Sequence, residues 1–70
     1  MSFVEMLTAS IGKTVEVILV DQMFIGVLTT VNSSSLTLEG SGGQYYYYDY
    51  GPSNTVTISL PQIQSVHIIS

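Results

Sequence analysis

Apolar and polar residues alternate over most of this chain, and that period of two limits its fold more than any other feature. Successive side chains of a β-strand point to opposite faces, so the alternation predicts strands with one face turned toward a core. In the first such run, Val15, Val17 and Leu19 share one face. In residues 55–60, threonine and serine alternate with valine, isoleucine and leucine in the same way. The chain is therefore predicted to be mainly β.

Turn residues divide the alternating segments into five predicted strands. The first three occupy residues 13–39, and Asp21-Gln22 is expected to form the tight turn after the first. The last two occupy residues 55–69 and are separated at Pro61-Gln62, because proline cannot donate a ladder hydrogen bond. Gly26 predicts a bulge or a strong bend inside the second strand. The expected limits are 23–31 for the second strand, 35–39 for the third, 55–60 for the fourth and 63–69 for the fifth.

A short helix is predicted at residues 2–11, ahead of the first strand. Ser2 and Glu5 have the spacing of a capping box, in which each side chain binds the other residue's backbone amide. Gly12 supplies the stop. The residues expected to share one face of this helix are Phe3, Met6, Leu7 and Ser10.

The composition favours a small domain that associates with copies of itself. The chain has 70 residues and no cysteine, so residues 1–70 form one domain near the lower size limit, without disulfides. Apolar residues make up 46% of it and charged residues only 9%, which is little charge for a soluble monomer. Small domains often gain stability by forming oligomers, so further copies are expected to cover part of the apolar surface.

The charges argue against nucleic acids and anionic membranes as partners. The net charge is −4, Lys13 is the one cation, and arginine is absent. Nucleic acids and anionic lipids both require clusters of lysine and arginine, which this chain could supply only if a multimer placed Lys13 in a ring. No apolar run approaches the roughly 20 residues of a spanning helix. The N-terminus lacks the basic and apolar layout of a signal peptide, so we expect the chain to be cytoplasmic at synthesis.

A tyrosine-rich insert lies between the third and fourth predicted strands, at residues 40–54. Its tyrosines are Tyr45, Tyr46, Tyr47, Tyr48 and Tyr50, all five of the chain, among glycine, serine and asparagine. The rings could line a subunit interface, stack on bases or sugars, or form dityrosine cross-links. They could also form a surface loop or pack on the chain's own sheet. Adjacent strand residues point to both faces, so one core satisfies at most half of the rings, and we favour intermolecular contact.

No group of residues in the sequence has the pattern of a catalytic or cofactor site. His67 is the only histidine, and one histidine without further ligands makes a poor metal site. Nothing resembles a nucleophile elbow, and residues 40–43 are glycine-rich without the Lys-Ser/Thr pair of a phosphate loop. We therefore expect a non-enzymatic protein without metal or cofactor.

The order of these elements, together with three segments, resembles the Sm-like fold. The first segment is Ile11-Gly-Lys-Thr-Val-Glu-Val17, which opens the first strand. The second is Gly26-Val-Leu28, where that family bends its second strand, and the third is Val56-Thr-Ile-Ser-Leu-Pro-Gln-Ile63, which looks like its closing motif. The resemblance covers about residues 7–39 and 55–69 and leaves the insert outside. Within the family the chain looks most like small Sm-like proteins of spore-forming Firmicutes, which share the Ile-Gly-Lys start and the Gln62-Ile63 step.

The resemblance implies a five-stranded, strongly bent, partly open Sm-like barrel with the tyrosine-rich insert between strands three and four. Sm-like rings close by pairing strand four of one copy with strand five of the next. If this chain forms the same joint between copies, four of its strand residues are expected to lie in that interface together with the tyrosines. The strand residues expected there are Val56, Ile58, Val66 and Ile68.

The chain departs from the RNA-binding members of that family at both pocket motifs. Those members carry an Asp and a Met-Asn pair before strand three, where this chain has Asn32-Ser-Ser-Ser35. They carry an Arg-Gly pair later, where this chain has Ser59-Leu60. Turn chemistry alone accounts for Asn32 and the serines after it.

The sequence thus leads to two functional hypotheses that it can rank, and to a third, a small-molecule or peptide adaptor that uses the tyrosine loop, that it cannot rank. The first is a structural protein that assembles into rings, stacks or fibres through its strand edges and insert. For this hypothesis the spore-former resemblance implies a place in spore surface layers. The alternative is an RNA-binding Sm-like ring of the RNA-chaperone type.

Overall fold

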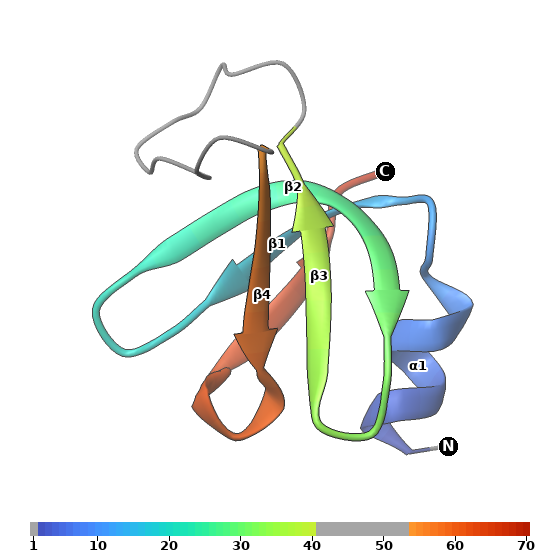
Figure 1. Cartoon of the computed structure of the whole chain (residues 1–70), viewed down its shortest axis with the longest axis horizontal. Coiled ribbons are helices and arrows are strands. Elements are labelled where there is room, and N and C mark those ends of the chain that lie inside the picture. The colour runs from blue at the N-terminus through green and yellow to red at the C-terminus, as the bar shows by residue number, and fades with distance from the viewer. Residues whose placement is uncertain (1, 41–53) are drawn as a thin grey trace.

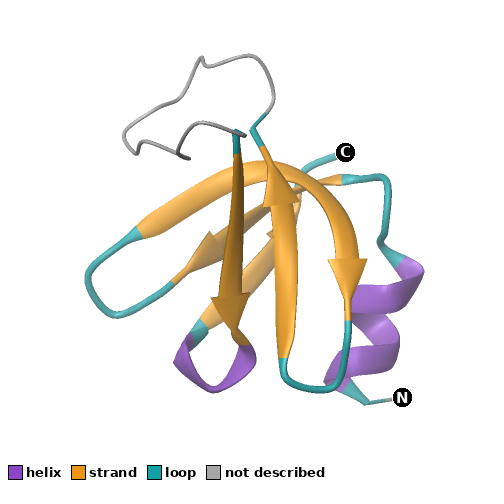
Figure 2. Cartoon of the chain, in the orientation of Figure 1, coloured by secondary structure: helices purple, strands orange, loops and turns teal. Residues whose placement is uncertain are grey.

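The computed structural model of this protein describes residues 2–40 and 54–70. One short helix precedes five antiparallel strands, and the strands form a single sheet in the order β4-β3-β2-β1-β5 (Figures 1 and 2). The sheet is not closed, because β4 and β5 are its two ends. The predicted mainly β fold with one N-terminal helix and five strands is confirmed. The elements are α1 (Phe3–Ala9), β1 (Thr14–Ile18), β2 (Met23–Val31), β3 (Ser35–Glu39), β4 (Thr55–Ser59), a 3₁₀ turn η1 (Leu60–Gln62) and β5 (Ser65–Ile68).

Helix α1 starts at the predicted capping box and ends earlier than predicted. The Glu5 amide donates to Ser2 Oγ at 3.1 Å, and the Ser2 amide donates to Glu5 Oε1 at 2.9 Å. The helix ends at Ala9, before the predicted residue 11, and Gly12 reverses the chain at φ +94°. Of the residues expected to share one helical face, Leu7 and Ser10 are buried, whereas Phe3 is 43% exposed. Helix α1 has only seven residues, and Leu7 is the one that is buried where the helix packs against β2.

Strand β2 bends because its two halves pair with different strands. Its first half pairs with β1 and its second half with β3, and Figure 1 shows it arching over the sheet. The register runs unbroken through Gly26, opposite Val15, and the irregularity lies between Leu28 and Thr30. Of the two alternatives predicted at Gly26, the bulge is therefore wrong, whereas the strand is strongly bent (Figure 1). Thr29 is the extra residue, and it is tolerated because it is exposed and its hydroxyl donates to the Thr37 carbonyl at 3.2 Å.

The core lies on the inner face of this curved sheet and is completed by the helix. Burial alternates with a period of two along β1, β2 and β3, as the sequence pattern predicts. Packing of these inward side chains supplies most of the stability available to so small a domain. The buried hydrophobic residues are Leu7, Val15, Val17, Phe24, Leu28, Leu36, Leu38 and Ile58.

The turn between β1 and β2 lies one residue earlier than predicted. The Leu19 amide donates to the Gln22 carbonyl at 2.8 Å, which makes Val20-Asp21 the tip in place of Asp21-Gln22. Ile18 pairs with Met23, and the register continues from there. Moving the turn by one residue changes the partner of every strand residue by two positions. Both registers therefore keep the same side chains inside, and the alternation could not distinguish them.

The end of the sheet near η1 departs from the predicted strand limits. Strand β4 stops at Ser59 instead of residue 60, and β5 covers Ser65–Ile68 instead of 63–69. The predicted break at Pro61-Gln62 is confirmed, and it takes the form of the 3₁₀ turn η1. The Leu60 amide donates to the Ser34 carbonyl at 2.9 Å, which ties η1 to the turn between β2 and β3.

Candidate subunit interface

Strand β4 is one end of the sheet, with β3 on one side and no strand partner on the other among the described residues. Its sequence, Thr-Val-Thr-Ile-Ser, contains no charge, proline or glycine. Thr57 lies on the outer face, where its hydroxyl is 3.2 Å from that of Thr37 on β3. Natural edge strands are usually guarded by charge, proline or bulges, because their free amides and carbonyls can template another strand. Strand β4 has none of these guards.

Strand β5 is the other end of the sheet and is similarly unguarded. It pairs with β1, and its second edge has no strand partner within residues 2–40 and 54–70. Its sequence, Ser-Val-His-Ile, has neither proline nor glycine. His67 pairs in register with Glu16 and is exposed on the outer face of the sheet.

The predicted strand residues of the interface fall on these two opposite edges. Val56 on β4 and Val66 on β5 are half-buried, and Ile68 is 41% exposed, so all three keep surface that a neighbour can cover. Ile58 is only 3% exposed, because its side chain packs inside the core opposite Leu36. Ile58 therefore offers a partner only its backbone. Within one copy β4 and β5 do not pair with each other, although Val56 and Val66 both pack against the same core.

The predicted tyrosines, Tyr45 to Tyr48 and Tyr50, lie outside the described residues. The structure does describe the two residues that flank this segment. The Gly40 amide donates to the Asn54 carbonyl at 2.8 Å, and Asn54 Nδ2 donates to the Gly40 carbonyl at 2.9 Å. This Gly40–Asn54 clasp extends the β3–β4 pairing by one residue pair. It fixes both ends of the segment side by side at the start of edge strand β4.

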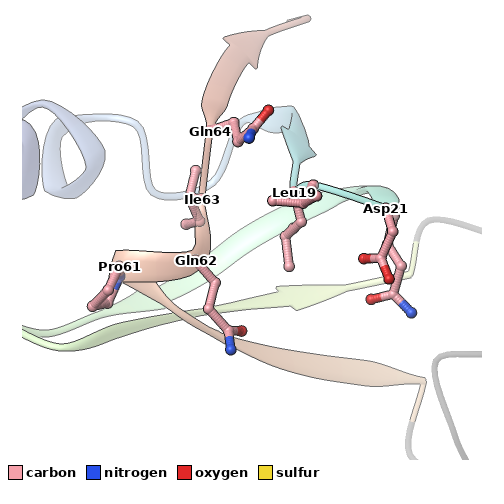
Figure 3. A pocket seen from close by; sticks show the side chains of 8 residues that line it. Leu19, Asp21, Pro61, Gln62, Ile63 and Gln64 are labelled. Carbon is pink, nitrogen blue, oxygen red and sulfur yellow. The ribbon is translucent and has the colours of Figure 1, made fainter.

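Sequence reasoning missed a hollow of about 390 Å³ beside the β1–β2 turn (Figure 3). One wall is the turn itself and the other is η1 with the residues that follow it. Val20 at the turn tip is 81% exposed, the most exposed large apolar side chain among the described residues. The sequence feature that could have pointed to this hollow is the valine at the turn tip, since turns normally carry glycine, asparagine or aspartate. The lining residues are Leu19, Val20, Asp21, Gln22, Pro61, Gln62, Ile63 and Gln64.

The residues weighed for ligand chemistry lie in ordinary structural settings. The Asn32 side-chain oxygen accepts from the amides of Ser34 and Ser35 at 2.8 and 2.9 Å, which closes the β2–β3 turn. Lys13 is exposed at the entry to β1. Across the described part of the chain, no three His, Cys, Asp or Glu side chains are gathered in a way that could hold a metal ion. Within the same residues, no helix has the length and apolar character needed to cross a membrane.

Comparison with protein-family models, with curated proteins and with solved structures found no match to this chain. The functional argument therefore depends on the geometry of the two edges.

Proposed function

We propose that this protein is a non-enzymatic structural protein that assembles with further copies of itself, strand β4 of one copy pairing with strand β5 of the next. The observation that carries the proposal is that the strands at both ends of the sheet contain no aspartate, glutamate, lysine, arginine, proline or glycine. Within the described part of the chain, no strand covers the outer edge of β4 or of β5, and such edges can template another strand. Pairing β4 of one copy with β5 of the next covers both edges at once.

The joint also buries apolar surface. On β4, Val56 lies on the inward side beside the core, and on β5 the half-buried Val66 and the exposed Ile68 are available. Strands that continue the sheet place these side chains on neighbouring strands, where they can pack across the seam. Each methylene removed from water contributes about 0.8 kcal/mol. A few such contacts add to the new backbone hydrogen bonds.

The joint uses a different edge on each copy, so it is heterologous and repeats from copy to copy. Rings form if the rotation between copies closes, and fibres form if it does not. The tyrosine-rich insert supplies further contacts in the proposed assembly. We extend the proposal to an Sm-like fold, for which the strand order, the shared bend of β2 and the turn between β4 and β5 give support. By the same resemblance, spore surface layers are the proposed location.

The RNA-binding alternative has less support. The chain has one cation, Lys13, so a basic surface for phosphates requires an assembly that gathers the Lys13 residues of several copies. The Asn32 oxygen, which stands in the loop that carries the RNA pocket in Sm-like proteins, already accepts two backbone amides. We therefore retain self-assembly as the proposed function.

The proposal is tested by charging one edge. Thr57→Lys puts a lysine on the exposed outer face of β4, a device that natural edge strands use against pairing. Thr30→Lys is the matched control, because Thr30 lies in the same row of paired residues but two strands away from the edge. Thr30 pairs with Thr37 on β3, and Thr37 pairs with Thr57 on β4. Sedimentation velocity and electron microscopy then report particle mass and shape. We expect Thr57→Lys to shift the mass toward the monomer and Thr30→Lys to assemble like the unchanged chain. Monodisperse monomers of the unchanged chain at high concentration would refute the proposal.

A further inference from the structure

The hollow beside the β1–β2 turn is built by backbone hydrogen bonds and does not need an occupant to form. The Leu19–Gln22 bond closes one wall, and the Ile63 amide closes the other by donating to the Leu60 carbonyl at 3.1 Å. The Gln64 amide then donates to the Ile18 carbonyl at 2.7 Å and joins the two walls. A preformed site loses little conformational entropy when it binds.

Its lining combines an apolar floor with a rim of unpartnered amides. Leu19 and Ile63 are half-buried against the core, and Pro61 lies beside them (Figure 3). The glutamines at the rim are exposed, and none of their side-chain amides forms a hydrogen bond to another described residue. Each amide offers two donors and an acceptor. The rim glutamines are Gln22, Gln62 and Gln64.

The charge of the hollow selects a neutral occupant. Asp21 is its one charged lining residue, and no lining residue is cationic. Phosphates and carboxylates would meet repulsion there without a compensating lysine or arginine. A volume of about 390 Å³ suits a ring-sized group. The fitting ligand therefore has a flat apolar body and a neutral tip that can both donate and accept a hydrogen bond.

A tyrosine side chain has this combination, with a large apolar ring and a hydroxyl. All five tyrosines of the chain lie at residues 45–50. We propose that the hollow receives a tyrosine of residues 45–50 from a neighbouring copy, with its ring on Leu19 and Ile63 and its hydroxyl at the rim. This inference depends on the proposed self-assembly and names the surface that the insert meets.

The length of the segment permits this contact in an edge-paired assembly. If the sheet continues antiparallel, Asn54 of the neighbour lies beside the C-terminal end of β5. Residues 61–64 of the hollow directly precede the N-terminal end of β5. They therefore lie four residues, or about 13 Å, from the C-terminal end of β5. Tyr48 is six residues from Asn54 (54 − 48 = 6), and six extended residues span about 20 Å.

The test fills the hollow and follows the tyrosines. Gln62→Phe places the chain's own ring over the floor, and Thr30→Phe is the matched control on the exposed outer face. The chain has no tryptophan, so intrinsic fluorescence reports on residues 45–50 alone. Acrylamide quenching is measured beside sedimentation over a concentration series. We expect assembly to protect the tyrosines in the unchanged chain and in Thr30→Phe, and Gln62→Phe to lose this protection while edge-paired particles persist.

Two results would overturn the inference and leave the proposed function intact. One is assembly in which Gln62→Phe protects the tyrosines as well as Thr30→Phe does. The other is full protection at dilutions where the unchanged chain is monomeric, which would place the tyrosines on their own copy. A mass that never rises with concentration is a distinct result, because it removes the proposed function itself. As a final check, copies with all five tyrosines replaced by serine are mixed with Gln62→Phe copies. Tyrosine protection that appears in the mixture and in neither variant alone supports the entry of a tyrosine from one copy into the hollow of another.

Discussion

The two hairpin turns that flank β2 are built in opposite ways. In the β2–β3 turn, the Asn32 oxygen accepts two amides and two hydroxyls, at 2.8 to 3.3 Å, from Ser34 and Ser35. In the β1–β2 turn, a single amide–carbonyl bond joins Leu19 and Gln22, and Val20 stands 81% exposed at the tip. Polar groups close the first turn, whereas the second leaves an apolar side chain in water.

This difference indicates that the β2–β3 turn stabilises the fold, whereas the β1–β2 turn is available for contact with another molecule. A turn with its hydrogen bonds satisfied internally gains stability and leaves little for a ligand. A turn with an apolar tip gains nothing from that side chain in the monomer. The contrast predicts that substitutions in the two turns act on different measurements.

The largest effect on folding is expected from Asn32→Ala. It removes the shared acceptor and leaves the Ser34 and Ser35 amides to water, so the free energy of unfolding should fall by about 1–2 kcal/mol. Urea denaturation followed by circular dichroism measures the change. Asn32→Asp is the control, because its carboxylate keeps the accepting oxygen. Equal losses in both variants would show that the acceptor is not the cause.

A smaller effect is expected at the β3–β4 connection, which resembles the Asn32 turn in using an asparagine side chain. A Cβ on Gly40 would lie 2.6 Å from Asn54 Oδ1, so Gly40→Ala must displace that side chain and lose its hydrogen bond to the Gly40 carbonyl. We expect about 1 kcal/mol of destabilisation.

The double variant Gly40→Ala with Asn54→Gly is the matched control. Glycine removes the clash and suits the backbone of Asn54, whose φ is +61°. Thermal melts should show the double variant to be at least as stable as Gly40→Ala alone. A further loss would mean that the clash is not what destabilises the single variant.

Val20→Asn should change the free energy of unfolding by less than about 0.5 kcal/mol, because the side chain is exposed and asparagine suits a turn. Its effect is expected in assembly, since it removes apolar surface from the rim of the hollow. Denaturation measures the effect on the free energy of unfolding, and sedimentation of the same sample measures the effect on assembly. A loss above 1 kcal/mol would place this turn in the same class as the Asn32 turn.

The smallest effect is expected for RNA. A gel-shift series at low salt should show no complex, and Lys13→Ala should leave that result unchanged, because one exposed lysine per copy cannot hold a phosphate backbone. A complex that weakens steeply with salt would revive the RNA-binding alternative.

Much of the fold could be predicted from residue pattern and local chemistry. The alternation correctly put Val15 and Val17 on one face of a strand, and both residues lie in the core. The capping box at Ser2 and Glu5 is local, and it forms as its spacing requires. Pro61 broke the ladder for the covalent reason that it has no amide proton.

The errors have a common cause, which is that several arrangements satisfy the same alternation. Two registers of the β1–β2 hairpin bury the same residues, so the position of its turn could not be deduced. The bulge lies at Thr29 and not at Gly26, because the change of partner strands along β2 decides where an extra residue is tolerated. The prediction that Ile58 belongs to an interface stays a prediction, but the sequence pattern did not show that its side chain lies in the core while its backbone lies on an edge strand.

The sequence by itself determined the number and order of the elements, the inward face of each strand and the shortage of charge, because these follow from neighbouring residues along the chain. Only the tertiary structure decided which strands lie at the ends of the sheet and which polar groups remain without partners. Those properties depend on pairings between distant segments, such as β1 with β5 and η1 with the β1–β2 turn. The two open edges and the hollow belong to this second class, so the surfaces proposed for assembly emerged only with the fold.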